Sequence, residues 1–225
     1  MHQASKTVTL FALAICVLLG TLPANAGQNP HFTVFVYNDA RVSDDILARA
    51  ERRATLTFAR AGFDLNWVNC PRGNTDHTLS LCNRTGRPEH LNLRIITHVA
   101  SSTSDAAFGV AFLGPDGTGR YCDVFWKRVE ALHTSDDVDL AGILGSLMAH
   151  EIGHLLLGSH AHAISGIMRG HWESGELHQI AMGTLRFLPW QEQRMRLRVT
   201  AWGARSLLMV QAGPDAGVLA TCCVP

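Results

Sequence analysis

The chain has 225 residues, a length that favours a single domain with enough residues to bury a substantial core. Its 19 lysine and arginine residues balance 19 aspartate and glutamate residues, so there is no net charge at neutral pH. A nucleic-acid-binding domain needs a basic stripe, and the sequence shows none. Composition therefore predicts a neutral folded domain and argues against nucleic acid as a partner.

The N-terminal segment 1–26 has the three parts of a secretory signal peptide. Lys6 precedes the apolar run Val8–Gly20, and Ala24-Asn25-Ala26 then reads as a small-residue cleavage site. The alternative is a membrane anchor, but a span needs about 20 apolar residues and this run is shorter. We therefore expect cleavage after Ala26, a secreted or periplasmic location, and no stable membrane insertion of the mature chain.

The cysteines fit an exported chain. The mature chain keeps five of the six cysteines: Cys70, Cys82, Cys122, Cys222 and Cys223. Cys70 and Cys82 flank a polar loop that contains proline and glycine, and a disulfide between them would close it. An odd number leaves at least one thiol free or bound to another molecule. Because there is no Cys-x-x-Cys pair, we do not expect a cysteine zinc knuckle.

The first half of the mature chain predicts alternating strands and a helix. Three apolar runs predict strands: His31–Tyr37, Phe63–Val68 and Leu91–Ile96. Between the first two, a helix begins near Ser43 or Asp44, runs to about Ala61 and ends at Gly62. A strand, a helix and a strand in sequence predict a crossover connection in a mixed sheet.

The next segment predicts a hairpin-like pair of strands. The first strand is Ala106–Leu113, the second is Tyr121–Val129, and Gly114-Pro115-Asp116-Gly117 between them is a strong turn signal. The glycines of this turn do not predict a phosphate site, because no Gly-Lys-Ser/Thr follows.

The second half of the chain is predicted to be helical. Asp136, Asp137 and Asp139 favour a helix start, and Leu140–Leu157 is then almost entirely apolar or small, as in a buried helix. Two further helices are predicted at Glu173–Met182 and Pro189–Val199. The expected organisation is a single domain, 27–202, followed by a C-terminal tail, 203–225.

The buried helix carries the motif His150-Glu151-Ile152-Gly153-His154. Residues four apart share a helix face, with Cβ atoms roughly 5–6 Å apart, so His150 and His154 can bind one zinc ion. Glu151 is rotated by about 100° and flanks the metal, where a general base for a zinc-activated water belongs. Three protein ligands and one water form a catalytic zinc site, whereas a structural zinc has four protein ligands.

This motif, a glycine and further histidines after it, and Gly166-Ile167-Met168 together resemble the zincin metallopeptidases and their metzincin branch. Leu157 stands where the metzincin pattern His-Glu-x-x-His-x-x-Gly-x-x-His has glycine, and Gly158 comes one residue late. The chain is more similar to a group of poorly characterised bacterial exported metallopeptidase-like proteins. Their pattern is His-Glu-Ile/Leu-Gly-His-Leu-Leu-Leu, a short turn, a histidine and Gly-Ile/Leu-Met.

The resemblance extends from the first strand to about Val199 and implies an α+β, zincin-like fold. This fold has a twisted mixed sheet, a backing helix, a buried active-site helix and C-terminal helices. The resemblance also implies one zinc ion and leaves two candidates for the third ligand. Strict metzincin spacing points to His160, whereas similarity to the bacterial group and the late Gly158 point to His162. We favour His162, with His160 as the alternative.

Other residues have weaker assignments. Met168 is expected to pack beneath the ligands without binding the metal. His171 could stabilise an oxyanion but fits better as a surface residue, and Asp123 and Glu130 are expected to be solvated. By its position upstream of the motif, Ala106–Leu113 resembles the edge strand that metzincins align with substrate, although a purely structural strand is an equal alternative.

The sequence thus predicts a secreted zinc metallopeptidase, most simply an endopeptidase, that acts on peptides or proteins with Glu151 as general base. It leaves the oligomeric state open. One alternative is an exported zinc-binding protein without catalysis, against which Glu151 argues because a metal store needs no base. The other is a zinc hydrolase that acts on a non-peptide amide.

Overall fold

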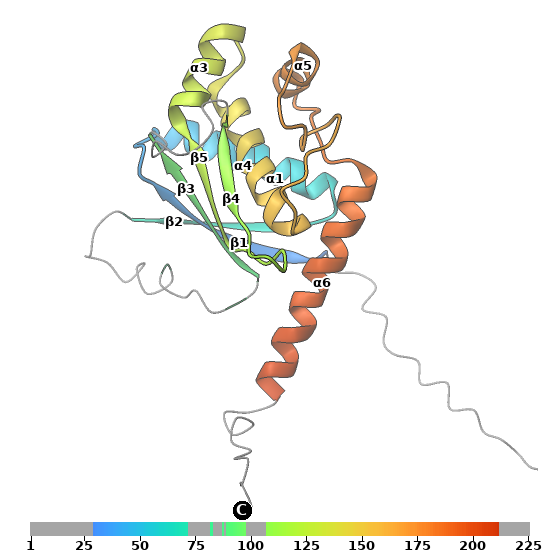
Figure 1. The fold of residues 1–225 in the computed structure, drawn as a ribbon. Helices are drawn as coiled ribbons and strands as arrows, with labels where there is room; N and C mark the ends of the chain where they lie inside the picture. The colour runs from blue at the N-terminus through green and yellow to red at the C-terminus, as the bar shows by residue number, and fades with distance from the viewer. Residues whose placement is uncertain (1–28, 72–81, 83–86, 88, 98–106, 212–225) are drawn as a thin grey trace, which may run out of the picture.

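The computed structural model describes residues 29–71, 82, 87, 89–97 and 107–211 (Figure 1). The predicted signal peptide, the residue Ala106 and the tail cysteines Cys222 and Cys223 lie outside these residues.

A five-stranded sheet with the strand order β2-β1-β3-β5-β4 forms one layer of the protein. Its strands are β1 (His31–Asn38), β2 (Asp64–Cys70), β3 (His90–Ile96), β4 (Gly109–Phe112) and β5 (Tyr121–Phe125). The pairs β1–β2, β1–β3 and β3–β5 are parallel, whereas β4 is antiparallel to β5 and lies at the edge. The sheet is therefore mixed, as expected, and the hairpin-like pair is confirmed.

Helices cover one face of the sheet (Figure 1). They are α1 (Asp44–Arg60), α3 (Trp126–Asp136), α4 (Leu140–Leu157), α5 (Ser174–Met182) and α6 (Pro189–Gln211). The backing helix α1 packs along α4, and α4 in turn contacts β4 and β5. This α+β arrangement is the one predicted from the sequence.

The helix α4 is buried on almost every side. By length and composition it could cross a membrane, but 94% of it is buried inside the protein, which accounts for its apolar sequence. It begins where the Asp139 carboxylate accepts a hydrogen bond from the Gly142 amide, at 2.9 Å. It ends at Gly158, whose φ of 63° is a left-handed conformation that glycine adopts without strain.

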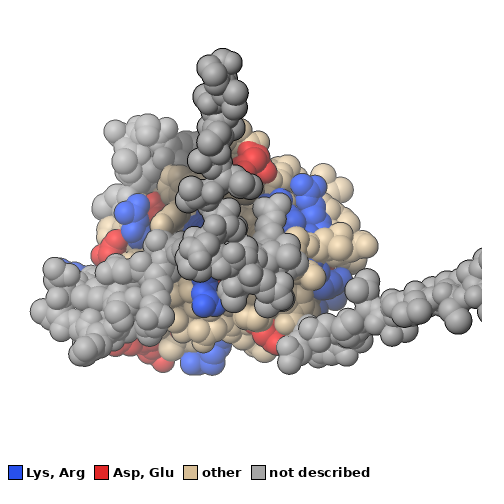
Figure 2. All heavy atoms as spheres, turned by 90° about the horizontal axis from the view of Figure 1, so that it is seen from below, with Lys and Arg blue, Asp and Glu red and all other residues tan. Residues whose placement is uncertain are grey.

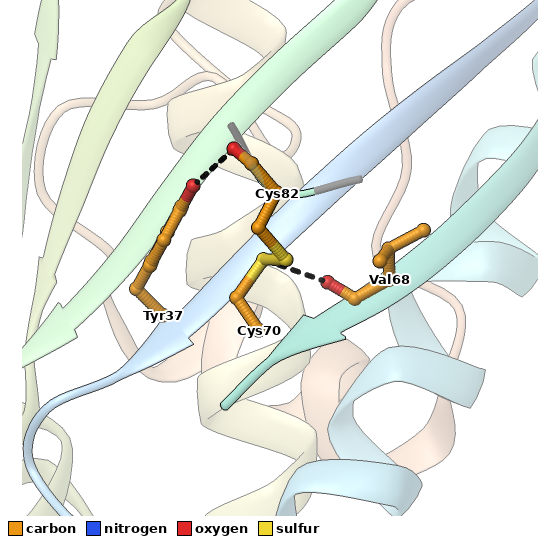
Figure 3. The surroundings of a disulfide bond; sticks show 4 residues. All are labelled: Tyr37, Val68, Cys70 and Cys82. Atoms are coloured by element: carbon orange, nitrogen blue, oxygen red, sulfur yellow. Dashed lines mark hydrogen bonds between the residues drawn. A yellow bond between two sulfur atoms is a disulfide. The ribbon is translucent and has the colours of Figure 1, made fainter. Parts of the chain in front are cut away.

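The two faces of the sheet bury different residues because side chains alternate along a strand. Phe32, Val34 and Val36 of β1 belong to the main core beneath the helices, whereas Phe35 belongs to a small second cluster on the other face. The predicted disulfide between Cys70 and Cys82 is present in this second cluster. The Tyr37 hydroxyl donates a hydrogen bond to the Cys82 carbonyl beside it (Figure 3).

Several predicted element boundaries are wrong. The run Tyr121–Val129 is not one strand: β5 ends at Phe125, which is also the last residue paired with β3, and α3 begins at Trp126. A strand without a partner leaves its main chain unpaired, so the chain turns into a helix that buries Trp126 and Val129, three residues apart.

The predicted helix boundaries differ in two further places. Asp136 and Asp137 end α3 and do not begin α4, whose N-cap is Asp139. At the C-terminus α6 continues past Val199 to Gln211, and Figure 1 shows its last turns extending beyond the sheet.

Charged side chains are dispersed over the face of the described residues that Figure 2 shows. Basic and acidic groups alternate there with uncharged surface, and neither sign forms a continuous field. This distribution agrees with the balanced composition.

Candidate metal centre

Three histidines from two parts of the chain meet at one point. His150 and His154 project from α4, and His162 lies in the turn that follows Gly158. Their candidate ligand atoms all lie within 4.8 Å of one another. The helical spacing brings the first two together, and the reversal of the chain after α4 adds the third.

Hydrogen bonds to main-chain carbonyls fix the tautomers of the two helical histidines. The Nδ1 atom of His150 lies 2.7 Å from the Ile167 carbonyl oxygen, and that of His154 lies 2.7 Å from the Ser159 carbonyl oxygen. A carbonyl oxygen only accepts, so each Nδ1 carries the proton and donates it. Each Nε2 is then left with a lone pair available for a metal.

These two lone pairs face each other. The Nε2 atoms of His150 and His154 lie 3.1 Å apart. With both protons on Nδ1, neither nitrogen can donate to the other, so a cation between them would remove a repulsive contact. Two nitrogens that bind one tetrahedral zinc at about 2.0–2.1 Å lie about 3.3 Å apart, which fits the observed separation.

Burial keeps both imidazoles neutral. Desolvation, followed by the neighbouring His154, lowers the pKa of His150 to about 3. Desolvation also lowers the pKa of His154 to about 4. Neutral imidazole is the form that binds a metal, so both side chains are in the binding form at neutral pH.

His162 and His160 occupy different places around this pair. The His162 ring centroid lies 5.4 Å from that of His150 and 5.0 Å from that of His154. The His160 ring centroid lies 6.3 Å from that of His154, and His160 is not a member of the three-histidine group. His162 thus belongs to the group of three, and His160 lines the same cavity.

The segment Gly166–Met168 supports the histidines from below. The Ile167 carbonyl accepts hydrogen bonds from both His150 and the Trp172 indole, and the Ile167 amide donates to the Arg186 carbonyl at 2.9 Å. Met168 is fully buried, and its Sδ would lie 2.6 Å from a Cβ on Gly153. Met168 therefore packs closely beneath α4, as expected.

Glu151 lies beside the three histidines in an apolar environment. Its side chain is buried, and desolvation, followed by the nearby charge of Asp123, raises its pKa to about 8. The edge strand approaches it closely: a Cβ on Gly109 would lie 2.5 Å from Glu151 Oε1 and 2.7 Å from the Asp123 carbonyl oxygen. Only a residue without a side chain lets β4 pass at this distance.

The prediction that Asp123 is solvated is wrong. Its carboxylate is buried and accepts two hydrogen bonds from Arg94, at 3.1 and 2.8 Å, because the two residues are paired on adjacent strands. Glu130 also has a partner, Lys127, at 2.8 Å. His171 is exposed, as the surface assignment predicted.

A cavity of about 180 Å³ opens over the histidines and Glu151. Most of its wall surface is apolar, and residues 107–111, which include the first part of β4, line it. The other lining residues are Leu147, His160, Arg169, Gly170 and Trp172. A molecule that enters the cavity could therefore reach the three histidines, with the strand β4 beside it.

Sequence reasoning missed the groups that orient the site. The carbonyls of Ser159 and Ile167 belong to the main chain, so no residue type marks them. Gly109 and the pair of Arg94 with Asp123 become recognisable only when β3, β4 and β5 are placed side by side. Arg169 lines the cavity and forms ion pairs with Glu173 and Glu176. The sequence signal for this local network was the capping box that the two glutamates form at the start of α5.

No protein-family model matches the chain, and no curated protein matches its sequence. Several solved structures are similar to it at low sequence identity, among them those of the following three proteins. A zinc-dependent peptidase from Methanocorpusculum labreanum is 15% identical, with 72% of this chain and 99% of that chain covered and a TM-score of 0.49. Archaemetzincin from Methanopyrus kandleri is 16% identical, with 78% and 99% covered and a TM-score of 0.44. Metalloproteinase-II from Bacteroides fragilis is 12% identical, with 78% and 55% covered and a TM-score of 0.45.

Proposed function

We propose that this protein is a secreted, zinc-dependent metallopeptidase with a zincin-like fold. The observation that carries the proposal is the pair of Nε2 lone pairs on His150 and His154, 3.1 Å apart, with His162 and the buried Glu151 beside them at an open cavity. Three neutral imidazoles form the donor set of a catalytic zinc, and the cavity leaves room for a further ligand.

A zinc ion bound by His150, His154 and His162 would supply Lewis acidity that polarises the scissile carbonyl and makes water acidic at neutral pH. Glu151 accepts the proton from the attacking water and donates it to the departing amine. In the metal-free protein its apolar surroundings favour the protonated carboxyl. The charge of a bound zinc ion would lower this pKa and leave the carboxylate able to accept the proton. The carbonyls of Ser159 and Ile167 keep the imidazoles in orientation.

The edge strand β4 is the proposed support for the substrate. Among the described strands it pairs with β5 alone, and it forms part of the cavity wall. An extended peptide that adds to this edge gains main-chain hydrogen bonds whatever its side chains are. Such pairing does not need a chain terminus, which is why we propose an endopeptidase.

Export is proposed from the signal-peptide pattern of residues 1–26 together with the Cys70–Cys82 disulfide, which suits an oxidising compartment. The mature protein would begin at Gly27, with the peptidase domain at 27–202 and the tail at 203–225. The signal segment and most of the tail lie outside the described residues.

Metal analysis and digestion of a broad peptide library test this function together. We expect about one zinc per mature chain and cleavage by the parent protein. Glu151→Gln should keep the zinc and lower cleavage by about 10²–10⁴-fold, because the ligands remain and the base does not. Glu130→Gln is the matched control: it removes a carboxylate that binds Lys127 outside the cavity and should leave cleavage unchanged.

The outcomes separate the alternatives. A parent protein that binds zinc but cleaves no peptide pool, and no simple amide, would indicate a metal-binding protein without catalysis. Cleavage of small non-peptide amides alone would indicate a zinc hydrolase whose substrates are not peptides. Equal activity of Glu151→Gln and the parent would exclude Glu151 as the base.

A further inference from the structure

Three arginines of α6 bind main-chain carbonyls on three other elements. Arg194 Nε donates to the Leu157 carbonyl at 3.2 Å, Arg196 Nη1 to the Ala61 carbonyl at 2.6 Å, and Arg198 Nη2 to the Gly117 carbonyl at 2.9 Å. Leu157 and Ala61 lie at the C-terminal ends of α4 and α1, where unpaired carbonyls and the helix dipole favour a cation. Gly117 lies in the turn between β4 and β5.

Arg198 contacts two glycine turns at once. A Cβ on Gly158 would lie 2.5 Å from Arg198 Cζ and Nη2 and 2.7 Å from Nη1, so the guanidinium covers the position that a side chain would take. A Cβ on Gly117 would lie 2.6 Å from the Gly158 carbonyl oxygen. The end of α4, the β4–β5 turn and Arg198 are therefore packed directly against one another.

Both turns adjoin segments that line the cavity. Gly158 is followed by Ser159, whose carbonyl orients His154, and then by His160 and His162. The β4–β5 turn follows β4, which passes Glu151. We propose that Arg198 is a positioning residue that fixes the ligand-bearing turn and the edge strand relative to each other.

The electrostatic environment shows that this position is costly for an arginine. Among the described residues, Arg198 Nε is buried without a hydrogen-bond partner. Desolvation, followed by the charge of Arg194, lowers the pKa of Arg198, and only Asp116 opposes this. The contacts of the Arg198 guanidinium with the two turns therefore have to offset the cost of its burial.

The inference rests on the proposed zinc site, and its test uses readouts that do not need catalysis. We compare Arg198→Met with Arg196→Met, a matched control on the same helix that loses an equivalent hydrogen bond to the end of α1. Zinc affinity is measured by competition with a chelator at a temperature where both variants are folded. Amide hydrogen exchange of the metal-free proteins is followed in the segments 109–118 and 158–163.

We expect Arg198→Met to exchange faster in both segments and to bind zinc about tenfold more weakly, the low end of the loss seen when groups that orient metal ligands are removed. Arg196→Met should change zinc affinity less than about twofold and leave both segments as in the parent. If the parent cleaves peptides, the Arg198→Met substitution should also raise KM more than Arg196→Met does, because the edge strand is displaced.

Arg198→Lys provides the second variant if Arg198→Met does not fold. Lysine keeps the charge and can reach one carbonyl but cannot cover Gly158 with a planar group, so an intermediate loss is expected. Equal behaviour of the Arg198 and Arg196 variants, or faster exchange in only one of the two segments, would overturn the proposal. A parent that binds zinc without cleaving peptides would refute the peptidase function and leave this test valid.

Discussion

The two halves of the candidate metal centre are built differently. The helical half, with His150, Glu151 and His154, is buried, with 4–6% of each residue exposed. The turn half, with His160 and His162, is exposed. One is positioned by the regular geometry of α4, and the other depends on contacts with distant elements such as Arg198 and the Arg186 carbonyl. We therefore expect the geometry of the helical half to be fixed locally and the position of the turn half to depend on the residues that pack against it.

The largest expected effect concerns the ligands themselves. His154→Ala and His162→Ala should each lower zinc affinity by orders of magnitude, because two remaining imidazoles bind zinc poorly. His160→Ala should lower it less than about tenfold, since His160 lies outside the three-histidine group. Zinc titration with a competing chelator measures all three.

The relative losses of zinc affinity in His160→Ala and His162→Ala identify the third ligand. A greater loss for His160→Ala than for His162→Ala would make His160 the third ligand and support the strict metzincin spacing. Large and equal losses for both would indicate four histidine ligands, which leave no position for water.

The next effect concerns the close approach of β4 to Glu151. In Gly109→Ala the added methyl group would lie 2.5 Å from Glu151 Oε1, so the carboxylate or the strand has to move. We expect kcat to fall about 10–100-fold with zinc content unchanged, because the base is displaced and the ligands are not. Gly175→Ala in α5 is the control, since a Cβ there has nothing within 4 Å. Equal kcat values for the two variants would show that Glu151 does not depend on this contact.

A third effect is the pH dependence of the metal-free protein. The pKa values of His150 and His154 are lowered to about 3 and about 4, so below about pH 6.5 the unfolded chain binds more protons there and the free energy of unfolding decreases. The pKa of Glu151 is raised to about 8, so the folded protein keeps a proton that the unfolded chain loses above about pH 4.5. This stabilising contribution is lost as the pH rises to 8.

These groups together predict a maximum of stability near pH 6.5 for the metal-free protein. Urea unfolding of the parent and of Glu151→Gln, from pH 4 to pH 9, measures the contribution of each group. Glu151→Gln should lose the decline on the alkaline side and keep the decline on the acid side. An identical alkaline decline in both proteins would contradict the assignment to Glu151.

The smallest expected effect on the centre comes from the disulfide on the opposite face of the sheet. Replacing Cys70 and Cys82 by serine should lower the free energy of unfolding by about 3 kcal/mol in the chain-entropy model for a loop of this length. Zinc affinity should not change, because the bridge packs against Phe35 and Tyr37, away from the core that holds α4. A parallel loss of zinc would show that the two faces of the sheet are coupled.

Much of the fold could be predicted from local patterns. The strands β1, β2 and β3, the helix α1 with its Ser43 cap, and α4 are where their apolar periodicity and caps placed them. The helix α3 could not be predicted in the same way. The sequence predicts one strand from Tyr121 to Val129, and the change from strand to helix depends on where the neighbouring strand β3 ends.

The sequence by itself determined the helical half of the site. A four-residue spacing on an apolar helix places two imidazoles on one face, and the chain alone fixes that geometry because every hydrogen bond of a helix is local. The turn half was left with two candidates, since the direction of a turn depends on what packs against it. The tertiary structure brought His162 beside the helical pair, with Arg198 and Gly117 against Gly158 and the Ile167 carbonyl beneath His150. It also decided the surroundings of Glu151: burial and the neighbouring Asp123 raise its pKa, and both come from strands that only folding brings to α4.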